Sequence, residues 1–144
     1  MPVTTGMKGE GFYDQHSSPQ LAAINSVLPW LEEAVGRMDL PDVTPIVVVD
    51  FGCSEGRNSI AAMRKVVDAL RRRTPQPIQV VHSDLPTNNF NQLFVNLAAD
   101  APDARRQQVY SVAAGGSMFE MLMPPKTVTI AATFNAIGFL NHRP

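Results

Sequence analysis

The chain has 144 residues, 44% of them apolar and 17% charged, which is the balance of one globular domain and not of a disordered polypeptide. Its formal net charge of −1 excludes recruitment of nucleic acid or of an anionic membrane by bulk electrostatics. The single cysteine, Cys53, excludes an internal disulfide framework and fits a reducing compartment. Because no apolar leader and no stretch of membrane-spanning length is present, we expect a cytoplasmic protein.

Apolar spacing and turn residues predict alternating helices and strands along the chain. A first helix is expected over residues 19–35, with Ser18 as its cap, a kink at Pro29 and Trp30 in the core. Short β-branched runs that each precede a turn or helix are typical of buried parallel strands. Further helices are expected over residues 57–73 and 90–99, and strands over 46–51, 78–82, 109–113 and 127–134. This order indicates an α/β fold around a mostly parallel sheet.

A glycine turn follows the first predicted strand, within "VVVDFGCSEGRNS" at residues 47–59. Such a turn between a strand and a helix is a common ligand-binding device. It does not match a P-loop, because Gly52 and Gly56 are one residue too close and Arg57 stands in place of the lysine. It does not match a nicotinamide fingerprint either, because Ser54 stands in place of the middle glycine. Neither phosphate site is therefore indicated.

Two acidic residues stand at successive strand ends around this turn. Asp50, just before Gly52, would repel a pyrophosphate but attract a cationic amine or sulfonium. Asp84 ends the next strand, where a ribose diol is held in folds of this kind. The pair favours S-adenosyl-L-methionine as a ligand over a strand–turn–helix unit of purely structural role.

Four blocks of sequence, in order, resemble the SABATH family of salicylate, benzoate and jasmonate carboxyl methyltransferases. They are "MKGEGFYDQHSSPQ", "VVVDFGCSEGRNS", "HSDLPTNNFNQLF" and "GGSMFEMLMPPKTVTIAATFNAIGFLNHRP". The third is similar to the family's distinctive Asp-Leu-Pro-x-Asn-Asp-Phe-Asn element. The resemblance implies a Rossmann-like methyltransferase sheet, mostly parallel, with helices on both faces.

The resemblance also implies roles, position by position. S-adenosyl-L-methionine would be the cofactor, and a small-molecule carboxylic acid would accept its methyl group. No catalytic side chain and no metal ligand are implied. The positions implied to contact the cofactor are Tyr13, Ser17, Asp50, Gly52, Asn58, Asp84, Leu85, Ser117 and Met118, the last where the family has a phenylalanine against the adenine.

The implied substrate site comprises Gln20, Asn135, Gly138 and Phe139, and it departs from the family at three of these positions. Phe139 replaces a tryptophan whose indole N–H helps to hold the substrate carboxylate, and phenylalanine has no donor. Asn135 stands for a pocket tyrosine, and Gly138 for a pocket methionine. These changes imply a roomier pocket of different polarity.

Two regions are expected: residues 1–45 as an N-terminal arm and helix, and residues 46–144 as the first half of the cofactor-binding domain, without the family's helical cap. The strand over 127–134 should then pair on one side only. Its open edge should make the polypeptide self-associate, for example as a homodimer. We expect a methyltransferase acting on a carboxylic acid oxygen; the alternative is a truncated cofactor-binding module without turnover.

Overall fold

The structure, a computed structural model, describes residues 18–134 and residue 136. Helices and strands alternate along this part of the chain, as the sequence predicts. The helices are α2 (Ser18–Arg37), α3 (Arg57–Arg71) and α4 (Phe90–Arg106), and the strands are β1 (Ile46–Phe51), β2 (Ile78–Asp84), β3 (Val109–Gly115) and β4 (Ile130–Thr133). The expected α/β class is confirmed.

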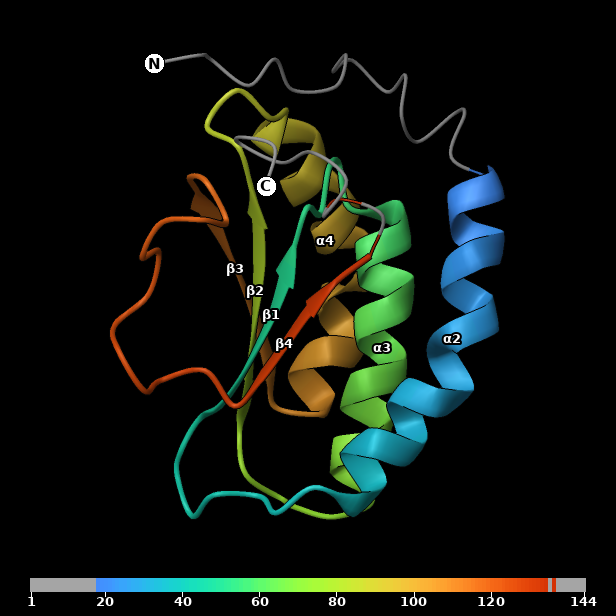
Figure 1. The fold of residues 1–144 in the computed structure, drawn as a ribbon, viewed down its shortest axis with the longest axis vertical. Coiled ribbons are helices and arrows are strands. Elements are labelled where there is room, and N and C mark those ends of the chain that lie inside the picture. The colour runs from blue at the N-terminus through green and yellow to red at the C-terminus, as the bar shows by residue number, and fades with distance from the viewer. Residues whose placement is uncertain (1–17, 135, 137–144) are drawn as a thin grey trace, which may run out of the picture.

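The four strands form one parallel sheet in the order β3-β2-β1-β4. Because the chain moves from β1 to β2 to β3 in one direction, right-handed crossovers place α3 and α4 on the same face of the sheet. Helix α2 packs beside α3 on that face (Figure 1). The helices and the strands they cover therefore enclose one main core.

The segment 116–129 leads from β3 to β4 and lies on the side of the sheet away from the helices (Figure 1). It forms turns and bends but no helix. Gly116 at its start, with Pro124 and Pro125 further along, explains why a helix does not form there. In the described part of the chain, the second layer of helices expected from the sequence is therefore not present.

The core lies between the sheet and the helices. In α2 the buried residues recur at helical spacing, which defines the stripe that faces α3 and the sheet. Leu70 of α3 and Ile78 of β2 are completely buried within the same cluster. Side chains that the helices and the sheet contribute to this cluster include Ile24, Leu28, Val35, Ile46, Val48, Val66, Leu70, Ile78 and Val80.

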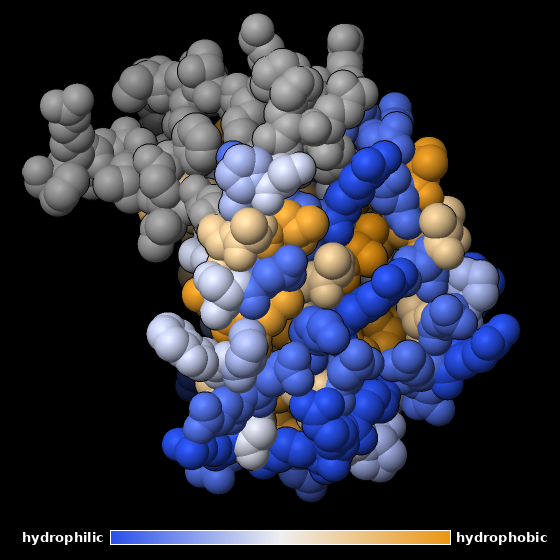
Figure 2. Space-filling model, turned by 90° about the vertical axis from the view of Figure 1, so that its right-hand side faces the viewer, coloured by the Kyte–Doolittle hydropathy of each residue, from blue (hydrophilic) through white to orange (hydrophobic). Residues whose placement is uncertain are grey.

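Helix α2 is continuous through Pro29, so the proline does not split it. The expectation that Trp30 lies in the core is wrong. Trp30 is 74% exposed, because it stands two residues beyond Leu28 and so points away from the buried stripe. The face of the molecule that carries α2 shows charged and polar side chains with separate apolar spots between them (Figure 2).

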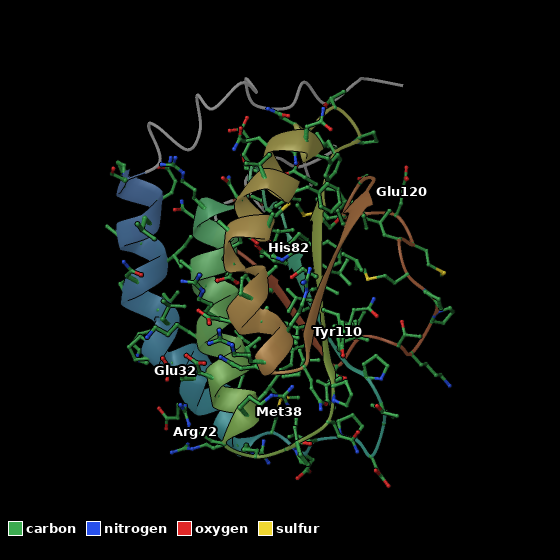
Figure 3. The ribbon with its side chains drawn as sticks, turned by 180° about the vertical axis from the view of Figure 1, so that it is seen from behind. Glu32, Met38, Arg72, His82, Tyr110 and Glu120 are labelled. Atoms are coloured by element: carbon green, nitrogen blue, oxygen red, sulfur yellow. The ribbon has the colours of Figure 1, made fainter. Side chains whose placement is uncertain are left out.

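Both outer strands are unpaired on one side within the described residues, β3 pairing with β2 and β4 with β1. The expectation that β4 pairs on one side is therefore confirmed. On β3, Tyr110 and Val112 alternate with the helix-facing residues and are 55% and 38% exposed (Figure 3). Phe119 and Met121, in the segment that follows, are also exposed.

Candidate functional site

The candidate site lies at the carboxyl ends of the strands. β1 is flanked by β2 and β4, so the end of β1 is a topological switch point, the usual ligand position in open α/β sheets. Asp50 and Gly52 stand at the end of β1, Asp84 ends β2, and Ser117 follows β3. Helix α2 begins at this end of the molecule, which brings Gln20 in its first turn to the same end (Figure 1).

Asp50 is 2% exposed. Burial raises the pKa of its carboxyl group to about 6; the hydrogen bond from Ser59 lowers this pKa, and the charge of Asp84 raises it. Its Oδ1 has no hydrogen-bond partner within the described residues. A buried carboxylate oxygen without a donor is costly, so the geometry points to a donor supplied by a ligand.

Asp84 is bonded to the backbone through both carboxylate oxygens. Oδ2 accepts from the N–H of Ser54 at 2.7 Å, and Oδ1 accepts from the N–H of Leu85 at 2.7 Å. Each oxygen keeps a further lone pair, so the carboxylate can still accept from a ribose hydroxyl. Asp84 therefore also holds the glycine turn in position through its hydrogen bond with Ser54, a role that the sequence analysis did not anticipate.

The glycine turn uses its own N–H groups within the protein. Those of Gly52 and Cys53 donate to the carbonyl of Ser83 at 2.7 and 3.0 Å, and that of Gly56 donates to the carbonyl of Cys53 at 3.1 Å. Gly52 and Gly56 have φ values of 90° and 102°, which L side chains rarely adopt. Because these donors are occupied, the turn is not built as a phosphate cradle.

In the described part of the chain, Ala136 lies close against Gly52. A Cβ at Gly52 would collide with the Ala136 side chain, just beyond β4. Cys53 is buried, its Sγ donates to the carbonyl of Ser54 at 3.4 Å, and burial raises the pKa of its thiol. The structure thus gives Cys53 a packing role and no nucleophilic one.

Asn58, in the first turn of α3, is another buried side chain with an unsatisfied polar atom. It is 9% exposed, and its Nδ2 has no partner within the described residues. An unsatisfied amide donor on α3 and an unsatisfied carboxylate oxygen of Asp50 on β1 match the two ends of an α-amino acid group, whose carboxylate accepts and whose ammonium donates. The donor set fits the methionyl end of S-adenosyl-L-methionine.

Ser117 and Met118 are held beside the end of β2. The N–H of Gly116 donates to the carbonyl of Asp84 at 2.9 Å. Ser117 Oγ accepts from the N–H of Phe119 at 3.3 Å, and both Ser117 and Met118 are partly buried. The fold therefore brings Ser117 and Met118 to the same edge as Asp84 and Leu85, as the sequence motifs imply.

Gln20 is partly buried in α2, and its Oε1 has no partner among the residues that the structure describes. No hydrogen bond joins it to the other candidate residues within that part of the chain. Five of the expected positions lie outside the described residues: Tyr13, Ser17, Asn135, Gly138 and Phe139.

Three asparagines that the sequence analysis did not single out hold the glycine turn in place. Asn88 Nδ2 donates to the carbonyl of Ser54 at 2.7 Å, and Asn89 Nδ2 donates to Glu55 Oε1 at 3.1 Å. Asn96 Nδ2 donates to the carbonyl of Glu55 at 2.7 Å. The signal was available in "LPTNNFNQLFVN", where asparagines precede and line one end of α4.

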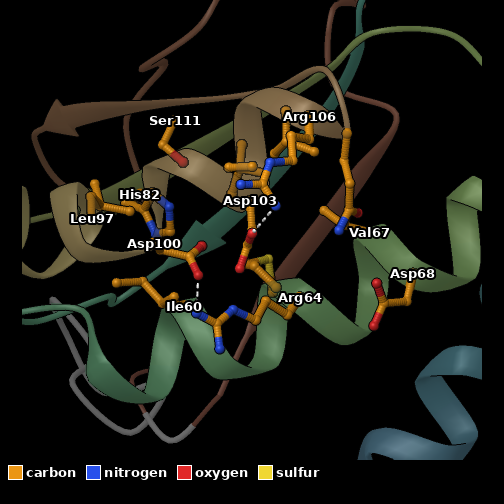
Figure 4. Close-up of a pocket in the computed structure, with 15 residues that line it drawn as sticks. Ile60, Arg64, Val67, Asp68, His82, Leu97, Asp100, Asp103, Arg106 and Ser111 are labelled. Atoms are coloured by element: carbon orange, nitrogen blue, oxygen red, sulfur yellow. Dashed lines mark hydrogen bonds and ion pairs between the residues drawn. The ribbon is translucent and has the colours of Figure 1, made fainter.

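A cavity of about 470 Å³ lies between α3 and α4 over β2 and β3 (Figure 4). Two ion pairs border it, Arg64 with Asp100 and Arg106 with Asp103. His82 lies on its inner wall beneath α4 (Figures 3 and 4). Within the described residues there is no cluster of three metal-ligating side chains, and no helix there is long and apolar enough to span a membrane.

Residues 2–144 match the family described as SAM dependent carboxyl methyltransferase, and the chain belongs to this family. The resemblance to the SABATH methyltransferases is thereby confirmed. S-adenosyl-L-methionine is the family's cofactor, and the unsatisfied atoms of Asp50 and Asn58 fit it.

Known relatives match nearly the whole chain. Paraxanthine methyltransferase 2 of Arabidopsis thaliana is 31% identical over 154 residues, which cover 99% of this chain and 42% of that protein. Gibberellic acid methyltransferase 2 of the same plant is 30% identical over 142 residues, which cover 92% of this chain and 36% of that protein. A solved structure, loganic acid methyltransferase with SAH, matches with a TM-score of 0.76 at 24% identity, over 90% of this chain and 38% of that one. The methyltransferase fold is confirmed, and the chain spans about two fifths of the length of these relatives.

Proposed function

We propose that the chain supplies the cofactor site of a methyltransferase that methylates a carboxylic acid oxygen of a small molecule. The observation that carries the proposal is the pair of buried, unsatisfied atoms, Asp50 Oδ1 and Asn58 Nδ2, at the switch point of the sheet. Membership in the family of carboxyl methyltransferases supports the reaction class.

Each cofactor-facing residue has a role that follows from its chemistry. Asp50 accepts from the ammonium group of the methionyl end, and Asn58 donates to its carboxylate. Asp84 accepts from the ribose hydroxyls with the lone pairs that the backbone leaves free. The apolar side chains of Leu85 and Met118 and the hydroxyl of Ser117 border the adenine. Tyr13, Ser17 and Gly52 complete the proposed set.

The cofactor supplies an activated methyl group on a sulfonium. An acceptor carboxylate is already ionised at pH 7, so the protein needs no general base. What the residues of the chain contribute is alignment and exclusion of water, and proximity alone supplies up to about 7–11 kcal/mol in model reactions. This is consistent with a site built from binding groups rather than from a catalytic triad.

Binding and turnover need separate tests, because the chain spans about two fifths of its relatives. Calorimetry with S-adenosylhomocysteine should show binding, whereas ATP should not bind. Asp50→Asn should weaken S-adenosylhomocysteine binding about 10- to 150-fold, the scale of one charge-assisted hydrogen bond. Asp103→Asn, at a side chain that is 76% exposed, is the control and should leave the affinity unchanged. Tighter binding of ATP would contradict the proposal.

The acceptor is proposed to lie against Gln20, Asn135, Gly138 and Phe139. Phe139→Trp should restore the indole donor that the family places there, and small aromatic acids should then gain affinity or turnover. The test is a methyl-transfer assay with a panel of carboxylic acids. No gain with any acid, alongside normal S-adenosylhomocysteine binding, would argue against a carboxylate at this position. Binding without turnover in every case would favour a cofactor-binding module.

A further inference from the structure

Asp50 and His82 lie side by side on neighbouring strands, beneath α3. They are partners in the register of β1 and β2 and are 2% and 1% exposed. Ser59, 3% exposed in the first turn of α3, contacts both: its Oγ lies 2.8 Å from His82 Nδ1, and it hydrogen-bonds the carboxylate of Asp50. The three side chains form one buried hydrogen-bonded chain between two strands and a helix.

One arrangement of protons satisfies every bond of this chain. Burial lowers the pKa of His82 to about 4, so its ring is neutral at pH 7 and carries a single N–H. With that proton on Nδ1, the ring donates to Ser59 Oγ, and the Ser59 hydroxyl donates to Asp50. In the opposite arrangement Ser59 donates to the ring, and the carboxylate loses its donor. The first arrangement is favoured, because an unpartnered buried carboxylate is the costlier outcome.

We propose that Ser59 and His82 are positioning residues for the cofactor: they fix one oxygen of Asp50 as an acceptor and leave Oδ1 for the ammonium group of S-adenosyl-L-methionine. The inference rests on the proposed role of Asp50. By donating to Ser59 Oγ, His82 orients the hydroxyl so that its proton points to Asp50 and not to the carbonyl of Glu55 or Gly56, the acceptors that lie four and three residues back. Neither residue touches the reacting atoms.

The other groups that face Asp50 do not replace this donor. Asp84, from β2, raises the pKa of Asp50. The thiol of Cys53 is held neutral, because burial and the charges of Asp84 and Asp50 raise its pKa. From β4, the register partner of Asp50 is Ala132, which has no charge. In the described part of the chain, Ser59 is therefore the group that favours the ionised form of Asp50.

The cavity beside His82 makes a matched pair of variants practical. Because the ring borders a space of about 470 Å³, a different side chain at this position meets open volume instead of overpacking the core (Figure 4). His82→Leu removes the donor to Ser59. His82→Asn keeps an amide N–H near the position of Nδ1.

The first measurement is the pKa of Asp50 in the free protein, followed by carbon-13 NMR of the aspartate carboxyl groups and assigned with Asp50→Asn. Ser59→Ala should raise this pKa by about one pH unit or more, the scale of one hydrogen bond to a charged group. His82→Leu should raise it less, and His82→Asn should leave it unchanged. The double variant should match Ser59→Ala alone, because the chain runs through Ser59. An unchanged pKa in Ser59→Ala, or additive effects in the double variant, would overturn the proposal.

The second measurement is the affinity for S-adenosylhomocysteine at pH 6.5 and pH 8.5. Ser59→Ala should weaken binding about 3- to 10-fold at pH 6.5 and less than about twofold at pH 8.5, where Asp50 is ionised again. An equal loss at both pH values would indicate a purely structural role and overturn the proposal. A shifted pKa with unchanged affinity would remove Asp50 from the cofactor site and overturn this inference. Absence of binding by the unmodified protein would instead defeat the proposed function.

Discussion

The buried pair of Asp50 and His82 predicts two opposite pH dependences of stability. The pKa of Asp50 is raised from 3.8 to about 6, so its contribution to stability is fully present below pH 3.8 and is lost as the pH rises through 6. The pKa of His82 is lowered from 6.5 to about 4, so its contribution is present above pH 6.5 and is lost as the pH falls through 4. Between pH 7 and pH 4 the two contributions therefore change in opposite directions.

Each difference in pKa corresponds to about 3 kcal/mol at its full extent, at about 1.4 kcal/mol per pH unit. Relative to the unmodified protein, the free energy of unfolding of His82→Leu should rise by about 3 kcal/mol as the pH falls from 7 to 4. That of Asp50→Asn should fall by about 2 kcal/mol over the same interval, because part of its contribution appears only below pH 4. The hydrogen bonds lost in each variant change its free energy of unfolding by an amount that does not depend on pH. The test is therefore how the difference from the unmodified protein changes with pH.

The assay is urea denaturation from pH 4 to pH 8, followed by circular dichroism, with Asp103→Asn as an exposed carboxylate control. The urea dependence of the unfolding free energy should be the same in all variants, so that midpoints report stability. If the free energies of unfolding of His82→Leu and Asp50→Asn change with pH in the same way as that of the unmodified protein, the reasoning is refuted.

Three further outcomes are expected. Asp84→Ala removes the acceptor of two backbone N–H groups, so it should lower the free energy of unfolding by about 2–4 kcal/mol. It should also weaken S-adenosylhomocysteine binding about 10- to 150-fold. Full affinity in a folded variant would contradict the proposal that Asp84 binds the ribose. Gly56→Ala should lower the free energy of unfolding by about 2–5 kcal/mol, because φ is 102° at this position and the new Cβ would lie 2.5 Å from Leu93 Cδ1. The control is Gly36→Ala, whose Cβ would meet no atom within 4 Å; urea denaturation should show it to be neutral or stabilising. Sedimentation of the 144-residue polypeptide should show self-association that Tyr110→Lys reduces, since within the described residues both outer strands are unpaired on one side and Tyr110 and Val112 of β3 are exposed. A monomer would argue against this.

The backbone of the site was predictable from local patterns, because they report on a single element. The predicted strand at 46–51 matches β1, and the glycine turn follows it as expected. The helix expected to end at residue 99 continues to Arg106 through Pro102, and Trp30, expected in the core, is exposed. Where a helix ends and which of its faces is buried depend on tertiary packing, which local patterns do not report. The links from Ser59 to His82 and from the asparagines to the turn depend on the register of β1 against β2, which no local pattern encodes.

The hydrogen bonds from the three asparagines and from Asp84 to the glycine turn connect two halves of the chain. The glycine turn belongs to the half that precedes β2, whereas Asp84, Asn88, Asn89 and Asn96 all belong to the half that begins with β2. A chain cut at the exposed Pro75 would separate the turn from Asp84 and from these three asparagines. Neither fragment could shape the turn alone, so recovery of cofactor binding would report directly on reassembly of the two pieces.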